Sequence, residues 1–232
     1  MKFIFLDTET TGMRKDEILT RDTAAGKREY LQKGDEVIQI GGLITDANLN
    51  PIRLFCHHCD TTVSGMEKKA LEVHGISMEF LRSYVKDIFL EEVIENELPE
   101  LYEDDIVTIG YNIDNFDIVM IKQTLRDSEH QPYFGVPVIN NIIPSNGKYT
   151  LDLVPFFIKN FNGRYVRQRL EVLAKKRENE YYQFLESYSK LPLSTNIPLE
   201  KAFPNGIGSH NSMYDSIICY LLMKELWKRK LH

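Results

Sequence analysis

The stretch FLDTETTG, residues 5 to 12, places two carboxylates at the end of an apolar run and follows them with a glycine. If residues 2 to 8 form a strand, Asp7 and Glu9 project from one face, because side chains two apart on a strand point the same way. Like charges this close raise each other's pKa unless a cation lies between them. Mg²⁺ and similar hard cations take oxygen ligands from carboxylates, water and phosphate. The pair therefore predicts half of a metal site.

Two later segments can supply the other half. In residues 109 to 125 an apolar run is followed by Asn112 and then by Asp117, where helical spacing begins. In residues 209 to 227, Asp215 falls in the first turns of a helix with an apolar face, where the positive end of the helix dipole favours an anion. His210 lies at or just before the start of this helix. We expect these side chains to meet Asp7 and Glu9.

Taken together, these residues resemble the DEDDh 3′ to 5′ exonucleases, the family of the proofreading epsilon subunit of bacterial DNA polymerase III. Asp7-Thr8-Glu9 is similar to the first family motif. The second and third motifs are matched by Asn112 with Phe116-Asp117, and by His210 with Asp215 in the histidine form. The second motif has three residues between Asn112 and Phe116 where the epsilon group commonly has two, which makes Asp114 an alternative to Asp117.

The resemblance implies a single catalytic centre that holds two Mg²⁺ or Mn²⁺ ions. Its metal ligands would be Asp7, Glu9, Asp117 and Asp215. His210 would take the proton from the attacking water, since an imidazole has a pKa near 6.5. The pocket for the 3′-terminal nucleotide would be formed by Thr10, Thr11, Val73, His74, Asn112 and Phe116.

The implied reaction is hydrolysis of the terminal phosphodiester of single-stranded or frayed DNA, with release of nucleoside 5′-monophosphates. Such an enzyme would serve proofreading or repair, with a DNA polymerase or another replication protein as its partner. Within the same family, an exoribonuclease that trims RNA or short oligoribonucleotides is the alternative. From another class, the alternative is a non-catalytic module that binds nucleic acid or a replication partner. The five intact site residues speak against such a module, and Thr10-Thr11-Gly12 favours DNA.

The order of elements predicts a ribonuclease H-like fold, a mixed β-sheet flanked by α-helices. Strands are expected at 2–8, 36–46, 52–58, 105–110 and 149–153. Helices are expected at 66–72, 77–84, 87–97, 115–127, 154–161, 168–177, 178–190 and 212–230. We expect residues 1–232 to form a single exonuclease domain with insertions at 13–35 and 176–209. The first insertion would be a flexible basic flap over the substrate, and the second would let His210 move.

Composition sets further bounds. The net charge of −6 argues against a protein that grips long duplex DNA through a broad basic face. The sequence has no long apolar span and no recognisable signal peptide, and its three cysteines offer no disulfide framework. We therefore expect a cytoplasmic protein.

Two clusters allow more than one interpretation. Cys56-His57-His58-Cys59 contains metal-ligating residue types, but no second pair follows at zinc-finger spacing, so zinc binding stays open. A basic cluster is either a solvated helix face or a phosphate track for single-stranded nucleic acid. It comprises Arg164, Arg167, Arg169, Lys175, Lys176 and Arg177.

Overall fold

A computed structural model describes residues 1–13, 17–23, 26–32, 34–102, 105–127, 150–161, 164–203, 206, 208 and 210–230. Its strands are β1 Lys2–Thr10, β2 Glu17–Thr23, β3 Gly26–Gln32, β4 Val37–Asp46, β5 Pro51–His58, β6 Ile106–Gly110, β7 Thr150–Asp152, β8 Ile158–Phe161, β9 Arg164–Arg167 and β10 Leu193–Ser194. Its α-helices are α1 Lys68–His74, α2 Met78–Tyr84, α3 Leu90–Glu97, α4 Asp117–Asp127, α6 Leu170–Lys175, α7 Glu178–Ser187 and α8 Ser212–Lys230. Two 3₁₀ turns are η1 Pro99–Tyr102 and η2 Val154–Phe157.

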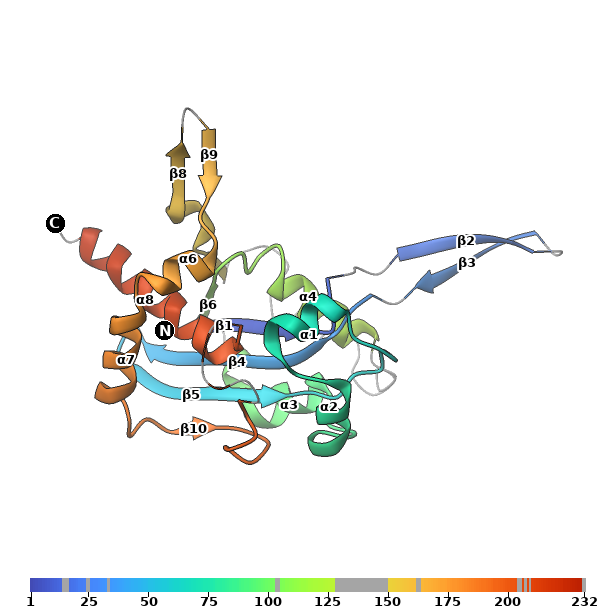
Figure 1. The fold of residues 1–232 in the computed structure, drawn as a ribbon, viewed down its shortest axis with the longest axis horizontal. Coiled ribbons are helices and arrows are strands. Elements are labelled where there is room, and N and C mark those ends of the chain that lie inside the picture. Colours follow the sequence, from blue (N-terminus) through green and yellow to red (C-terminus); the bar gives the residue numbers. More distant parts are fainter. Residues whose placement is uncertain are drawn as a thin grey trace.

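The centre of the molecule is a mixed six-stranded sheet in the order β10-β5-β4-β1-β6-β7, with helices on both faces (Figure 1). Strands β1, β6 and β7 run parallel, and β4 runs antiparallel to both β1 and β5. The carboxyl ends of the three parallel strands therefore lie at one edge of the sheet. This edge receives the polar residues that follow the apolar part of β1.

Alternation along β1 divides the core into two layers. Phe3 and Phe5 pack in the cluster that contains the inner face of α8, whereas Ile4 and Leu6 pack in the cluster beneath α3 and α4. All four side chains are buried because both faces of the sheet are covered. The same alternation carries Asp7 and Glu9 towards α8 and Thr8 towards α4.

Helix α8 lies close against β4 because the strand has a glycine at the point of contact. A Cβ atom on Gly41 would lie 2.3 Å from the Ser212 hydroxyl oxygen, closer than any real side chain allows. The Ser216 hydroxyl donates a hydrogen bond to the Gly41 carbonyl at 2.9 Å. This close approach brings the first turn of α8 down to the level of the acids on β1.

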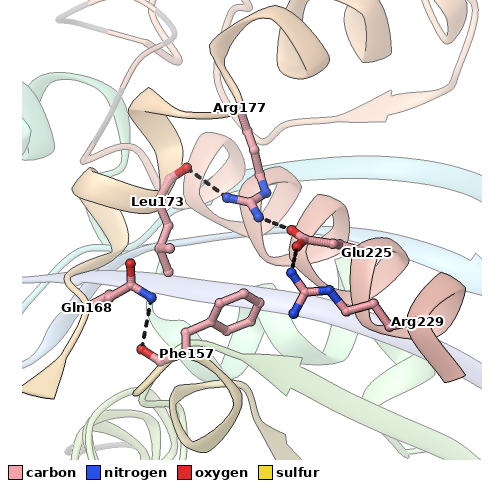
Figure 2. Close-up of polar contacts among 6 residues, drawn as sticks. All are labelled: Phe157, Gln168, Leu173, Arg177, Glu225 and Arg229. Carbon is pink, nitrogen blue, oxygen red and sulfur yellow. Dashed lines mark hydrogen bonds and ion pairs between the residues drawn. The ribbon is translucent and has the colours of Figure 1, made fainter. Parts of the chain in front are cut away.

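The far side of α8 is fastened to α6 and α7 by a shared carboxylate (Figure 2). Glu225 on α8 accepts from both Arg177 and Arg229, and Arg177 also donates to the Leu173 carbonyl at 3.1 Å. A buried guanidinium of this kind needs its charge paired and its donors satisfied. The network fixes the junction between α6 and α7 against the body of α8.

Two hairpins extend from this body (Figure 1). The first, β2–β3, occupies the segment expected as a flap at 13–35, and the second, β8–β9, rises beside α6. The helix expected at 154–161 is wrong after Phe157, because Ile158–Phe161 pairs with Arg164–Arg167 as a strand. The intervening Asn162-Gly163 is a hairpin signal in the sequence, although it lies outside the described residues.

The segment expected as the second insertion, 176–209, contributes to the core as well as to the surface. Tyr181 and Phe184 of α7 pack in the cluster that contains α8, and β10 pairs with β5 at the sheet edge. The helix predicted at 178–190 is confirmed as α7, which ends at Ser187. No helix in the described part of the chain is long and apolar enough to cross a membrane.

Candidate functional site

Three predicted acids meet at the carboxyl end of β1. Asp7 and Glu9 project from the α8 face of the strand, and Asp215 comes from the first turn of α8. One ligand oxygen from each of the three lies within 4.8 Å of the other two. Only carboxylate oxygens make up this group, and such a donor set suits a hard divalent cation such as Mg²⁺ or Mn²⁺.

The fourth predicted acid, Asp117, reaches the same place from the opposite face of the sheet. It is the first residue of α4 and is buried, with an exposed fraction of 2%. Its Oδ1 accepts hydrogen bonds from the Thr8 backbone N–H at 2.9 Å and from the Thr8 hydroxyl at 2.8 Å. Asp114 is exposed, so the geometry brings Asp117 rather than Asp114 to the acidic cluster.

The four carboxylates perturb one another. The pKa values of Asp7 and Glu9 are raised well above their usual range, first by burial and then by the charges of the neighbouring acids. Burial is also the main cause that raises the pKa of Asp117 and of Asp215 to about 7, although hydrogen bonds from Thr8 and from the His210 backbone oppose it. Divalent cations would remove this strain, because they neutralise charges that the burial makes costly.

His210 lies directly above Asp215. Its backbone N–H donates to Asp215 Oδ2 at 3.1 Å, and its φ of 65° falls in the left-handed region. A histidine seldom adopts that conformation, and backbone strain of this kind gathers at functional sites. Burial is the largest cause of a lowered pKa for His74, and the charge of His210 lowers it further.

A buried glutamine positions the start of α8, and the sequence analysis did not identify it. Gln39 on β4 accepts hydrogen bonds at its Oε1 from the Ser212 backbone at 3.1 Å and from the Ser212 hydroxyl at 2.8 Å. Asn211 caps the helix through bonds from the Met213 and Tyr214 backbone N–H groups. The sequence does contain a signal for this role, because Gln39 is the single polar residue within the apolar strand VIQIGGLI.

A cavity of about 150 Å³ opens beside the acids. Four of the predicted nucleotide-binding residues line it, namely Thr10, Val73, His74 and Phe116. Met13, Glu67, Lys69 and Ala70 also line it and were not predicted. The cavity lies between the end of β1, the helix α1 and the start of α4, so a group bound in it would be next to Glu9.

His74 is held as a neutral ring. Its Nδ1 accepts from the Ile76 backbone N–H at 3.0 Å, so Nε2 carries the proton and donates to the Thr10 carbonyl at 3.2 Å. Burial lowers the pKa of His74 to about 4, which agrees with a neutral imidazole. The ring fixes α1 against the end of β1 and forms a wall of the cavity.

The other two predicted pocket residues lie outside this cavity. Thr11 is buried, and its hydroxyl donates to Asp35 and accepts from the Glu36 backbone N–H. Asn112 lies just beyond β6 with a φ of 66° and donates its backbone N–H to Asp152 at 2.9 Å. The Thr11 side chain therefore stabilises the local fold through Asp35 and Glu36. The side-chain oxygen of Asn112 accepts a hydrogen bond from Arg167.

The cysteines of the Cys-His-His-Cys motif do not come together. Cys56 packs in the core cluster with α8, and Cys59 packs in the cluster with α3 and α4. Within the described part of the chain, the acids at the end of β1 are the one group of residues arranged to hold a metal ion.

Comparisons with known proteins agree with this arrangement. A family model described as exonuclease, RNase_T, matches residues 4–223. No curated protein matches the chain. Escherichia coli Exonuclease I in complex with a dA16 oligonucleotide has a TM-score of 0.60 and 17% identity, and the match covers 98% of this chain and 41% of that one.

Two further structures give the same result. Exonuclease I from Methylocaldum szegediense has a TM-score of 0.59 and 17% identity, and the match covers 98% of this chain and 40% of that one. The zinc-bound form of the E. coli Exonuclease I complex with single-stranded DNA has a TM-score of 0.59 and 16% identity. This match covers 100% of this chain and 41% of that one. The chain therefore spans about two fifths of the length of these proteins. The likeness confirms the predicted ribonuclease H-like mixed sheet.

Proposed function

Because the chain belongs to the RNase_T exonuclease family, we propose that it is a metal-dependent 3′ to 5′ exonuclease of the DEDDh type that acts on single-stranded DNA. The observation that carries this proposal is the cluster of Asp7, Glu9 and Asp215, whose ligand oxygens lie within 4.8 Å of one another beside His210. A mere structural role for these acids is hard to reconcile with their raised pKa values, because burial of mutually repelling carboxylates costs stability.

The four acids Asp7, Glu9, Asp117 and Asp215 would hold two Mg²⁺ or Mn²⁺ ions. Bound ions of this kind polarise a phosphodiester and make water a stronger nucleophile. The protein's own contribution is to fix the ligands: Thr8 holds Asp117 from the α4 side, and the His210 backbone holds Asp215 from the α8 side. Two independent elements therefore position the donors before any ion binds.

His210 is the group that would take the proton from the attacking water at its imidazole ring. It is not fully buried, and its backbone N–H contacts Asp215. A neutral imidazole at near-neutral pH is a suitable general base, and such catalysis contributes on the order of 10²- to 10⁴-fold in rate. His74 is unsuited to this role because both of its ring nitrogens are engaged by the backbone.

The cavity explains why cleavage would begin at a chain end. Its volume of about 150 Å³ is small, and its walls come from the end of β1, from α1 and from Phe116. We propose that it takes the 3′-terminal nucleotide, with the Phe116 ring available to contact the base. A terminal nucleotide bound there would place the adjacent phosphodiester beside Glu9, so the bond cleaved would be the terminal one.

The structures with a similar fold favour DNA over RNA as the substrate. The solved structures with this fold include Exonuclease I bound to dA16 and to other single-stranded DNA. Removal of nucleotides from DNA 3′ ends is an activity of proofreading and repair, so we place the protein in those processes, with a polymerase or another replication protein as its partner.

The test uses purified protein, Mg²⁺ and a 5′-labelled single strand made once as DNA and once as RNA. Stepwise shortening that EDTA stops is expected, with DNA degraded faster. Asp7→Ala should abolish activity, whereas Asp114→Asn, which changes an exposed carboxylate nearby, should keep it. Equal cleavage of a circular single strand, or full activity in Asp7→Ala, would rule the proposal out.

A further inference from the structure

The basic residues between β8 and α7 fall into two groups. Some are paired with a carboxylate, and others are free to bind an anionic ligand. Arg177 is 9% exposed, is paired with Glu225 and donates to the Leu173 carbonyl (Figure 2). Arg229 is paired with the same carboxylate. Arg177 holds the junction between α6 and α7 to α8, whereas Arg229 lies on α8 and pairs within that helix.

Lys159 and Lys176 behave differently. Lys159 lies on β8 and Lys176 directly follows α6, and both are exposed. The charge of Lys159 is the largest cause of a lowered pKa for Lys176, which shows that the two ammonium groups lie close together. Across the described ranges neither lysine forms an ion pair with a carboxylate. An anion bound between the lysines would relieve their repulsion.

Arg167 connects this basic hairpin to the acidic site. It is the last residue of β9, and its Nη1 donates to the Asn112 side-chain oxygen at 3.2 Å. Asn112 follows β6, the strand that pairs in parallel with β1. A guanidinium has five N–H donors, so a single bond to an amide leaves most of them for a phosphate, which arginine can bind through two parallel hydrogen bonds.

The base of the hairpin is fixed relative to the site. Gln168 donates to the Phe157 carbonyl through its backbone N–H at 3.2 Å and through its side chain at 3.3 Å, the latter bond being visible in Figure 2. The Tyr111 hydroxyl donates to the Gln168 carbonyl. These bonds tie both strands of the hairpin to the end of β6, so its cations keep a constant direction from the acids.

Exposed apolar residues lie next to the cations. Ile158 is 42% exposed and shares one face of the hairpin with its partner Arg167, whereas Val166 is 49% exposed and shares the opposite face with its partner Lys159. Positive charge that follows the phosphate backbone is one feature of surfaces that bind single-stranded nucleic acid.

We propose that Arg167 on one face of the β8–β9 hairpin, and Lys159 with Lys176 on the other, form a phosphate track along which the 5′ part of a single strand passes around the hairpin from the acidic site. Arg167 binds a phosphate near the site, and the lysine pair binds one farther along the strand. This inference rests on the proposed function for the identity of the strand as substrate.

The test measures binding without catalysis. Catalytically inert Asp7→Ala protein is titrated with a labelled single-stranded oligonucleotide at several salt concentrations, and fluorescence anisotropy gives Kd. Each lost phosphate contact lowers the slope of log K against log salt by about 0.7, so Lys159→Ala with Lys176→Ala should lower it by about 0.7 to 1.4. The matched control, Arg82→Ala with Lys86→Ala, removes two exposed cations beside α2, at the other end of the molecule (Figure 1), and should leave the slope unchanged.

Arg167 is tested by two replacements in the same assay. Arg167→Ala should weaken binding on the order of tenfold, the loss expected for a charge-assisted hydrogen bond. Arg167→Lys should restore part of the affinity, since it returns the charge without the paired donors. An unchanged slope in the lysine variant together with unchanged affinity in Arg167→Ala would overturn the proposal.

A second readout separates this inference from the proposed function. In otherwise wild-type protein, the ratio of kcat/KM on a long single strand to kcat/KM on a dinucleotide should fall in the lysine variant, because a dinucleotide does not reach the pair. If the protein hydrolyses no substrate while the salt slopes still change as expected, the proposed function fails and the track stands. If hydrolysis is normal and neither the slopes nor the ratio change, the track fails alone.

Discussion

Replacement of Asp7 by asparagine should stabilise the metal-free protein at about pH 8 although it removes a proposed catalytic ligand. A ligand oxygen of Asp7 lies within 4.8 Å of one on Glu9 and one on Asp215. At that separation two unit charges repel by roughly 3 kcal/mol if the effective dielectric constant is about 20. Asparagine has nearly the shape of aspartate but carries no charge, so the variant removes the repulsion between Asp7 and the neighbouring acids, and one such contact sets the scale of the expected effect.

The effect depends on pH in a defined direction. In the folded protein, burial raises the pKa of Asp117 and of Asp215 from 3.8 to about 7. The folded state therefore binds more protons than the unfolded state within this range. It follows that the free energy of unfolding decreases as the pH rises from about 4 to about 7. The pKa values of Asp7 and Glu9 are also raised well above their usual range, so the penalty persists above about pH 7 and is relieved in acid.

Denaturation by urea in EDTA measures this penalty. We expect Asp7→Asn to raise the free energy of unfolding by roughly 2 to 4 kcal/mol at about pH 8, which corresponds to about 5 to 10 °C in Tm for a domain of this size. Near pH 4.5 the difference should largely disappear, since the wild-type acids are then protonated. Added Mg²⁺ should stabilise the wild type much more than the variant, because only the wild type retains all four ligands.

Asp114→Asn is the matched control, because Asp114 is an exposed acid close to the same site. Its stability should differ from wild type by less than about 0.5 kcal/mol at either pH. If Asp7→Asn is less stable than the wild type in EDTA at about pH 8, the acids do not repel one another as a cluster, and the reasoning is refuted.

Three further outcomes are expected. His210→Ala should lose on the order of 10²- to 10⁴-fold in kcat yet keep the increase in Tm caused by Mg²⁺, since the residue would move a proton and bind no ion; loss of the Mg²⁺ effect would argue against this role. Asp117→Asn should nearly abolish activity, and Asp114→Asn should be mild; equal losses would mean that the second motif is misassigned. Replacement of residues 17–32 by a short Gly/Ser turn should weaken binding of long single strands with little change on a dinucleotide, and unchanged kinetics on both would remove the proposed role of the β2–β3 hairpin.

The acidic site could be predicted because its signals are local. Asp7 and Glu9 end an apolar strand, and Asp117 and Asp215 open helices, so each lies at a boundary that hydrophobic periodicity marks. The structure brings these boundaries to one edge of the sheet. The sequence already favoured Asp117 over Asp114, and the fold gives the physical reason: Thr8 donates hydrogen bonds to Asp117, whereas Asp114 is exposed.

Long-range partners were not predictable from the same patterns. Arg177 appeared to belong to one basic cluster with its neighbours, yet Glu225 on another helix neutralises it. Gln39 on β4 accepts hydrogen bonds from Ser212 in the first turn of α8. No pattern near Gln39 in the sequence indicates that Ser212 is its partner. Strand β8 was mistaken for the end of a helix, and β9 was not predicted, because the two strands are short and gain stability from each other rather than from a periodic apolar face.

The central claim is that this site removes nucleotides one at a time from a 3′ end, and the position of a label on the substrate tests it most directly. One single-stranded DNA is prepared with a 5′ label and again with a 3′ label, and both are sampled early in a Mg²⁺-dependent reaction. The account predicts a descending ladder from the 5′-labelled strand and only labelled mononucleotide from the 3′-labelled strand. A ladder from the 3′-labelled strand, or internal fragments from either, would contradict it.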